Sequence, residues 1–80
     1  MSHQSVSISS LKTGEQAIVL SFGCGRMVQN RLASLGFTPG AEVNVTQNYR
    51  FGPLIVTVRG ARVALGRGEA AQIFVQRRSA

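Results

Sequence analysis

Few side chains in this sequence could carry chemistry, and they are not spaced to act together. The soft candidate ligands for a metal ion are Met1, His3, Cys24 and Met27. They match no ligand spacing of a structural or catalytic metal site. The only acidic residues are Glu15, Glu42 and Glu69. These carboxylates are scattered, so we predict no metal site and no cofactor.

Cys24 has two interpretations. It precedes a predicted helix and lies two residues from Arg26, and both features lower the pKa of a thiol. The favoured interpretation is a small, half-buried side chain in the flexible stretch Gly23-Cys24-Gly25. A catalytic dyad would need His3 to reach Cys24, with no aspartate to orient the ring. We therefore expect a protein that is not an enzyme.

The Gly23-x-Gly25 pair before a helix superficially resembles a phosphate-binding turn. A dinucleotide fingerprint requires a third glycine at position 28, where this chain has Val28. The Lys-Ser/Thr pair of a P-loop is also absent. The sequence does not predict a nucleotide site.

Positive charge is the strongest compositional feature. Nine Lys and Arg residues oppose three glutamates, which gives a net charge of +6. Such a chain favours an acidic partner, which could be nucleic acid, an anionic membrane surface or an acidic protein. Net charge also keeps small proteins dispersed, so charge alone does not identify a partner.

Length and composition bound the architecture. Eighty residues are enough for one small domain. No apolar run approaches the roughly 20 residues that span a bilayer, and the N-terminus lacks the charged and apolar regions of a secretory signal. One cysteine cannot form an internal disulfide, which is typical of a reducing cytoplasm. We expect a flexible tail over residues 1–10, although Val6 and Ile8 alternate and could pair at a sheet edge, and a domain over residues 11–77.

The stretch 26–40 predicts the one substantial helix. Val28, Leu32 and Leu35 follow helical spacing and form one apolar stripe. Gly36 is suited to the left-handed residue that ends a helix. Phe37 can then fold back on the apolar side, and Pro39-Gly40 is typical of a type II turn.

Five short strands are predicted around this helix. Their ranges are 16–22, 42–49, 54–59, 63–65 and 72–76, with a tight, single-turn helical connection near 66–70. Gln47 interrupts the alternation of the second strand, which predicts a bulge there. Short strands joined by glycine turns predict a mainly β fold, a small five-stranded barrel with the helix after the first strand.

The alternation also predicts the core. Leu11 is expected to plug one end of the barrel, and Tyr49 is expected on the same face as Val43 and Val45. The remaining core residues are predicted to be Ile18, Leu20, Leu32, Leu35, Leu54, Val56, Val58 and Ile73.

Several blocks of the sequence together resemble the FeoA family of ferrous-iron transport accessory proteins. The most specific block is Arg-Leu-Ala-Ser-Leu-Gly-Phe-Thr-Pro-Gly at 31–40. It is accompanied by Leu11, Gly14 and Ile18, by Gly52-Pro53, and by the runs 55–60, 62–65 and 70–75. Gly66 departs from the expected pattern, in which a basic residue follows the leucine.

The resemblance implies an SH3-like barrel and a cytoplasmic protein that assists a membrane ferrous-iron permease carrying a GTPase domain. The resemblance also implies that the family is associated with transition metal ion binding, although the sequence of this chain contains no recognisable set of metal ligands. The protein would dock at the inner face of the membrane without a transmembrane segment of its own. The predicted contacts are Arg50, Phe51 and Pro53 at a hairpin tip, and a basic edge of Arg59, Arg62 and Arg67.

Two other functions stay open at this stage. A basic small barrel could bind nucleic acid, although no RRM-type or cold-shock-type stacking motif is present. A barrel that only assembles with copies of itself is the third possibility. Steep salt dependence of binding would favour nucleic acid, and light scattering would detect self-assembly.

Overall fold

The computed structural model describes residues 5–49 and 51–78. It contains one antiparallel sheet whose strands lie in the order β1-β6-β2-β3-β4-β5. The strands are β1 (Val6–Ser7), β2 (Gln16–Phe22), β3 (Glu42–Gln47), β4 (Leu54–Val58), β5 (Ala61–Leu65) and β6 (Ile73–Arg77). The helices are η1 (Ile8–Ser10), α1 (Arg26–Ser34) and α2 (Arg67–Ala70). The predicted mainly β architecture, with a helix after the first long strand, is confirmed.

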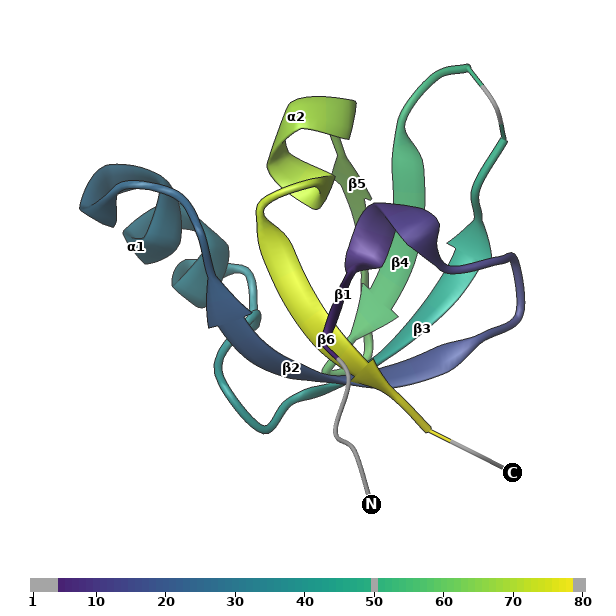
Figure 1. Ribbon diagram of the computed structural model, residues 1–80, viewed down its shortest axis with the longest axis horizontal. Coiled ribbons are helices and arrows are strands. Elements are labelled where there is room, and N and C mark those ends of the chain that lie inside the picture. Colours follow the sequence, from purple (N-terminus) through teal and green to yellow (C-terminus); the bar gives the residue numbers. More distant parts are fainter. Residues whose placement is uncertain (1–4, 50, 79–80) are drawn as a thin grey trace.

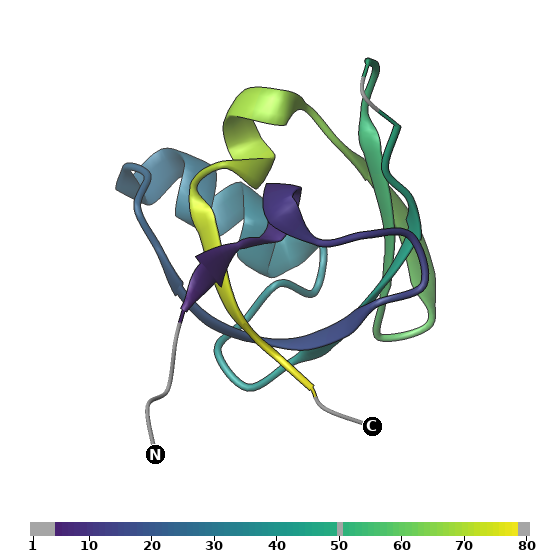
Figure 2. The same ribbon diagram turned by 45° about the vertical axis from the view of Figure 1, so that its right-hand side comes forward.

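The sheet is strongly curved, so its strands wrap around a single interior (Figures 1 and 2). The helix α1 stands to one side of the sheet, and α2 connects β5 to β6. The loop between β3 and β4 projects beyond the rest of the sheet in both views. This loop and α2 frame the same end of the barrel.

The sequence features of the region 26–40 act as predicted. Gly36 takes a φ of 106°, and the N–H of Phe37 donates to the carbonyl of Leu32 at 3.0 Å, which closes the helix end. Gly40 has a φ of 90°, and the N–H of Ala41 donates to the carbonyl of Thr38 at 2.9 Å. This geometry is the type II turn expected around Pro39. Phe37 is completely buried as a result.

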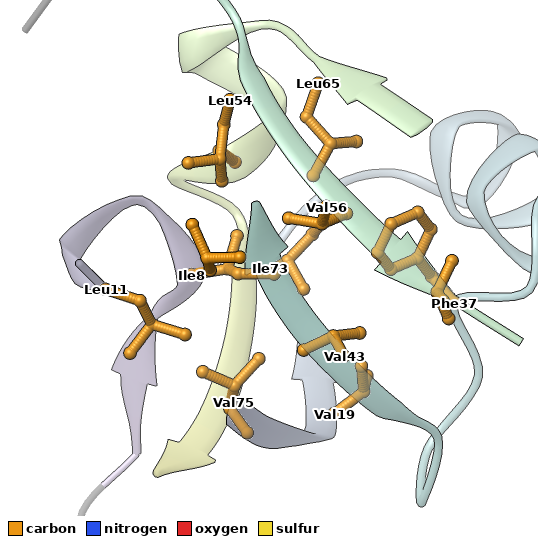
Figure 3. Close-up of a cluster of buried hydrophobic side chains, with 14 of the residues drawn as sticks. Ile8, Leu11, Val19, Phe37, Val43, Leu54, Val56, Leu65, Ile73 and Val75 are labelled. Carbon is orange, nitrogen blue, oxygen red and sulfur yellow. The ribbon is translucent and has the colours of Figure 1, made fainter. Parts of the chain in front are cut away.

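The interior is lined by aliphatic side chains from β2 to β6 and from the segment 8–11, together with Phe37 (Figure 3). Leu11 is buried at the barrel end, as predicted. Leu32 is the one fully buried residue of α1 among those described. The fully buried large side chains are Ile8, Leu11, Val19, Leu32, Phe37, Val43, Val45, Leu54, Val56, Val58, Leu65, Ile73 and Val75.

The predicted orientation of β2 is wrong. Ala17 and Val19 face the core, whereas Ile18 is half-buried and Leu20 is 38% exposed. Residues 17–20 are all apolar, so alternation could not decide which face is buried, and a shift of one residue turns every side chain over. A bulge between Val19 and Ser21 in the pairing with β6 then returns Phe22 to the core side.

Leu35 was also predicted in the core and is 41% exposed. The helix ends at Ser34, and Leu35 is the capping residue, so it no longer follows the buried stripe. Phe37 fills the interior in its place. Val28 packs against the core from its edge.

The structure differs from the flexible tail expected over residues 1–10. Val6 pairs with Val75, Ser7 pairs with Phe74, and Ile8 is completely buried. The alternation of Val6 and Ile8 reflects this edge pairing, which adds a sixth strand to the five predicted. Residues 1–4 lie outside the described part of the chain.

Candidate functional site

The loop between β3 and β4 carries two highly exposed aromatic side chains. Phe51 is 83% exposed and Tyr49 is 64% exposed. We call the surface formed by Tyr49, Phe51, Gly52 and Pro53 the aromatic tip. Arg50, which was predicted as a contact here, lies outside the described residues. Large apolar side chains exposed at a protruding loop are characteristic of contact surfaces rather than of folding alone.

Hydrogen bonds to two distant parts of the chain hold the loop in place. Asn48 lies at its base, where its side-chain amide donates to the carbonyl of Ser9 at 3.1 Å and its backbone N–H donates to Thr13 Oγ1 at 3.1 Å. Arg67 holds the tip from α2: its Nε donates to the carbonyl of Gly52 at 3.0 Å, and its Nη2 donates to the carbonyl of Tyr49. The aromatic tip is therefore supported at both ends.

The structure separates the three arginines of the predicted basic edge. Arg67 belongs with the aromatic tip, and its guanidinium binds backbone carbonyls there. Arg59 lies beyond the opposite end of β4, five residues from Leu54 and so about 16 Å away along an extended strand. Arg62 lies in β5 between these two ends. The aromatic tip and the predicted basic edge therefore do not form one continuous patch.

Arg59 is held against the end of α1. Its Nε donates to the carbonyl of Gly36 at 3.3 Å, and its Nη2 donates to Thr38 Oγ1 at 2.9 Å. It has a φ of 49°, and Gly60, which follows, has a φ of 80°. Two consecutive positive φ values between strands define a type I′ hairpin turn. Arginine is costly at the first of these positions, and the side-chain contacts help to offset that cost.

The three glutamates are each paired with an arginine. Arg77 Nε lies 3.0 Å from Glu15 Oε2, Arg78 pairs with Glu42, and Arg31 of α1 pairs with Glu69 of α2. Three of the nine basic residues therefore oppose the three acidic ones, and the excess of six positive charges belongs to the others. Those six are Lys12, Arg26, Arg50, Arg59, Arg62 and Arg67.

Glu15 has a perturbed acidity. The backbone N–H of Lys12 donates to Glu15 Oε1 at 2.7 Å and holds the pKa of this carboxyl below its ordinary value. Desolvation of the carboxyl raises the pKa in opposition, and the neighbouring Arg77 guanidinium lowers it further, so the net pKa is below the ordinary value. Glu15 fastens the turn before β2 to the end of β6, which is a structural role.

Among residues 5–49 and 51–78, no three His, Cys, Asp or Glu side chains gather where they could hold a metal ion. Cys24 is half-buried and packs against the core. No helix in the described ranges has the length and apolar character needed to cross a bilayer.

The sequence did not predict Tyr49 as a surface residue. Its expected inward direction assumed continuous alternation along β3, but the strand ends at Gln47 and its pairing with β4 shifts between Val45 and Gln47. The predicted bulge at Gln47 is therefore confirmed, and it is the reason Tyr49 does not follow Val45 into the core. The break in alternation at Gln47 was the feature of the sequence that could have predicted the exposure of Tyr49.

A small, strongly curved antiparallel sheet with a helix inserted after its first long strand is the architecture of the SH3-like barrel domains. Within that class, the family model described as FeoA domain matches residues 6–77. The chain belongs to the FeoA family.

Individual relatives agree with this assignment. A protein of Methanocaldococcus jannaschii named Fe(2+) transport protein A is 40% identical over 67 residues, which cover 81% of this chain and 78% of the relative. A crystal structure of an iron uptake regulatory protein (FeoA) superimposes with a TM-score of 0.87 and 34% identity, covering 92% of this chain and 99% of the other.

A third similar structure comes from Stenotrophomonas maltophilia. It is a FeoA complexed with zinc and described as an SH3 domain protein, with a TM-score of 0.77, 31% identity and 88% coverage of both chains. The two structures each cover most of this chain, and the match to the family model includes the region 31–40 that carried the resemblance in the sequence.

Proposed function

We propose that this chain is a non-catalytic accessory module that docks on the cytoplasmic side of a ferrous-iron permease with a GTPase domain and assists Fe(II) uptake. The relatives support the iron-transport part of this proposal through their names as Fe(2+) transport and iron uptake proteins. The docking part rests on one observation: Phe51 is 83% exposed on a loop that is fixed from two directions.

The chemistry of the aromatic tip suits protein contact. Aromatic side chains contribute strongly to interfaces because they bury a large apolar area with few rotatable bonds. The Arg67 and Asn48 contacts hold the loop, so less conformational entropy is lost when a partner binds. Arg67 acts here as a positioning residue, since its guanidinium hydrogen bonds are made within the chain.

The proposed role is regulation of the permease, through its assembly, gating or GTP turnover, rather than iron binding by this chain. The scattered acidic residues support this choice, because each glutamate is already paired with an arginine. Iron is then the cargo of the partner. The positive excess of the chain suits a partner surface that is acidic or lies next to anionic lipid.

The proposal is tested by titrating the protein against the purified permease, including its GTPase domain, at low and physiological salt. Saturable binding that persists at physiological salt and weakens in Phe51→Ala is expected. Met27→Ala is the matched control, because Met27 is 87% exposed but lies on α1. Binding that is unaffected by Phe51→Ala would contradict docking through the aromatic tip.

A parallel titration with mixed RNA tests the alternative. Nucleic-acid binding falls steeply as salt rises, in proportion to the number of phosphates neutralised. RNA binding at both salt concentrations, without binding to the permease, would overturn the proposed function and identify a basic nucleic-acid-binding barrel.

A further inference from the structure

We infer that the outer edge of β5 binds an extended acidic peptide segment of a protein partner, which pairs with it as an added strand. This site is distinct from the aromatic tip, and the inference does not depend on the partner being a transporter. It rests on three observations: the position of β5 in the sheet, the register of its hairpin, and a row of polar side chains across the adjoining strands.

The strand β5 ends the sheet. Its pairing runs from Leu54↔Leu65 to Val58↔Ala61, all with β4, and it has no second neighbour in the strand order of the described residues. Ala61, Arg62 and Ala64 are exposed, and Val63 is half-buried. Within the same described residues, no backbone hydrogen bond links β5 to any other loop or cap.

The hairpin turn fixes which backbone groups point outward. Arg59 and Gly60 form a two-residue type I′ loop, so its flanking residues Val58 and Ala61 are a hydrogen-bonded pair. Hydrogen-bonded and non-hydrogen-bonded pairs alternate along an antiparallel ladder. Arg62 and Ala64 therefore direct their N–H and C=O groups away from β4, toward the unpaired edge. Such a row of donors and acceptors is a template for an incoming strand.

The side chains beside this edge define the chemistry of the strand. Arg62 is paired with Thr57 of β4, and Thr57 is paired with Asn44 of β3, so the three lie in one row across the outer face. In the part of the chain that the structure describes, these three side chains form no hydrogen bond or ion pair with another group. They offer a guanidinium, a hydroxyl and an amide, which together suit a carboxylate.

A hollow of about 400 Å³ adjoins this row, lined in part by Asn44, Thr57, Arg59 and Gly60. Glu42 also lines it and is the acidic group facing the same surface. Its charge is opposed by Arg78. The hollow leaves room for a long acidic side chain to extend from the edge across the outer face.

The pairing register along β5 then predicts which residue types should alternate along the bound peptide. A residue placed directly opposite Arg62 lies on the same outer face, with its Cβ about 5 Å from that of Arg62, so an acidic residue is favoured there. The next residue lies opposite Val63, which faces inward and packs against the core, so an apolar residue is favoured. Ala64 is small and leaves space for a larger side chain. The predicted segment therefore alternates acidic and apolar residues.

Charge argues against a second copy of this chain as the occupant. Pairing β5 with itself would bring two Arg62 side chains to one face, between molecules that each carry a net charge of +6. Charged residues on edge strands commonly prevent such self-pairing. An acidic segment meets the same arginine favourably.

The test uses a blocked peptide, Ser-Glu-Val-Glu-Val-Glu-Ser, titrated into the isotope-labelled full chain and followed by NMR. Before addition, the amides of Arg62 and Ala64 should exchange with solvent much faster than those of Val63 and Leu65. Peptide binding should shift the signals of residues 61–65 and slow the exchange of Arg62 and Ala64. A peptide with lysine in place of glutamate should bind at least several-fold more weakly.

Variants of the protein separate the contributions of the backbone and of the side chains to peptide binding. Ala64→Pro removes one outward N–H and should weaken binding by roughly two- to tenfold, whereas Ala64→Ser retains the N–H and should bind normally. Arg62→Glu should reverse the preference between the acidic and basic peptides. Circular dichroism checks that each variant is folded.

The inference is overturned if the free protein already protects the Arg62 and Ala64 amides, because the edge would then be covered. It is also overturned if the acidic peptide does not bind, or shifts the aromatic tip instead of residues 61–65. Sedimentation that shows a dimer broken by Ala64→Pro would identify a second copy as the occupant and likewise contradict the inference. Binding of the permease to Phe51→Ala is a separate result and does not decide this question.

Discussion

Arg67 in α2 donates from its Nε to the carbonyl of Gly52 at 3.0 Å, so a helix that follows β5 holds the loop between β3 and β4. The two residues are separated by the whole β4–β5 hairpin in the sequence. Their contact gives an exposed aromatic loop a defined position without burying its aromatic side chains. The orientation of the aromatic tip therefore depends on a residue that does not itself need to touch the partner.

The first prediction concerns this contact. Arg67→Ala should lower the free energy of unfolding by about 0.5–1.5 kcal/mol and increase the mobility of Gly52 and Phe51, because the carbonyls of Tyr49 and Gly52 lose their donor. Chemical denaturation and backbone NMR relaxation measure the two effects. Arg62→Ala is the matched control and should leave the loop unchanged. Equal loop mobility in both variants would exclude the positioning role.

A second prediction uses the backbone strain at Arg59. Arg59→Ala loses the hydrogen bonds to Gly36 and Thr38 and keeps a non-glycine residue at a φ of 49°. Arg59→Gly loses the same hydrogen bonds but tolerates the positive φ. The glycine variant should therefore be more stable than the alanine variant by roughly 0.5–1 kcal/mol. Thermal and urea denaturation of both variants test this, and a more stable alanine variant would disprove the strain.

A third prediction distinguishes the two possible orientations of β2. Val19→Ala should lower the free energy of unfolding by about 2 kcal/mol, because Val19 is 1% exposed in the core. Leu20→Ala removes a larger side chain but should cost less than about 1 kcal/mol, because Leu20 is 38% exposed. The order of the two effects, measured by denaturation, is opposite to the order of side-chain size. A larger loss in Leu20→Ala would support the orientation predicted from sequence alternation.

The fourth prediction concerns acid stability. The pKa of Glu15 is lower in the folded chain than in the unfolded chain, so the unfolded state binds a proton more readily. Stability from Glu15 is therefore fully present above the unfolded pKa and is lost as the pH falls through the folded pKa. Glu15→Gln should be less stable than the wild type at neutral pH, and the difference should shrink as the pH falls through the folded pKa of Glu15. A difference that is constant with pH would contradict the assignment.

Local signals predicted the parts of the fold that depend on single residues. Gly36 and Pro39-Gly40 marked the end of α1 and the following turn because positive φ and fixed φ are properties of those residue types. The face of β2 could not be predicted, because residues 17–20 are apolar on both faces. The pairing of Val6 with Val75 joins the two ends of the chain, and no local pattern specifies such a long-range contact.

The candidate site was predicted only in part, because some of its features depend on local residue types and others on long-range contacts. Phe51 stood out beside Gly52 and Pro53, a composition typical of an exposed turn. The role of Arg67 depends on where α2 lies relative to the loop, which only the closed barrel determines. Arg59 and Arg62 looked like neighbours of Arg67 in sequence, but β4 and β5 place them progressively farther from the tip.

The most direct measurement of the central claim is Fe(II) uptake in cells whose own copy of this gene has been deleted. The wild-type chain and Met27→Ala should restore uptake, whereas Phe51→Ala should restore little of it despite normal folding and abundance. Full restoration by Phe51→Ala, or uptake that never depended on the gene, would contradict the account.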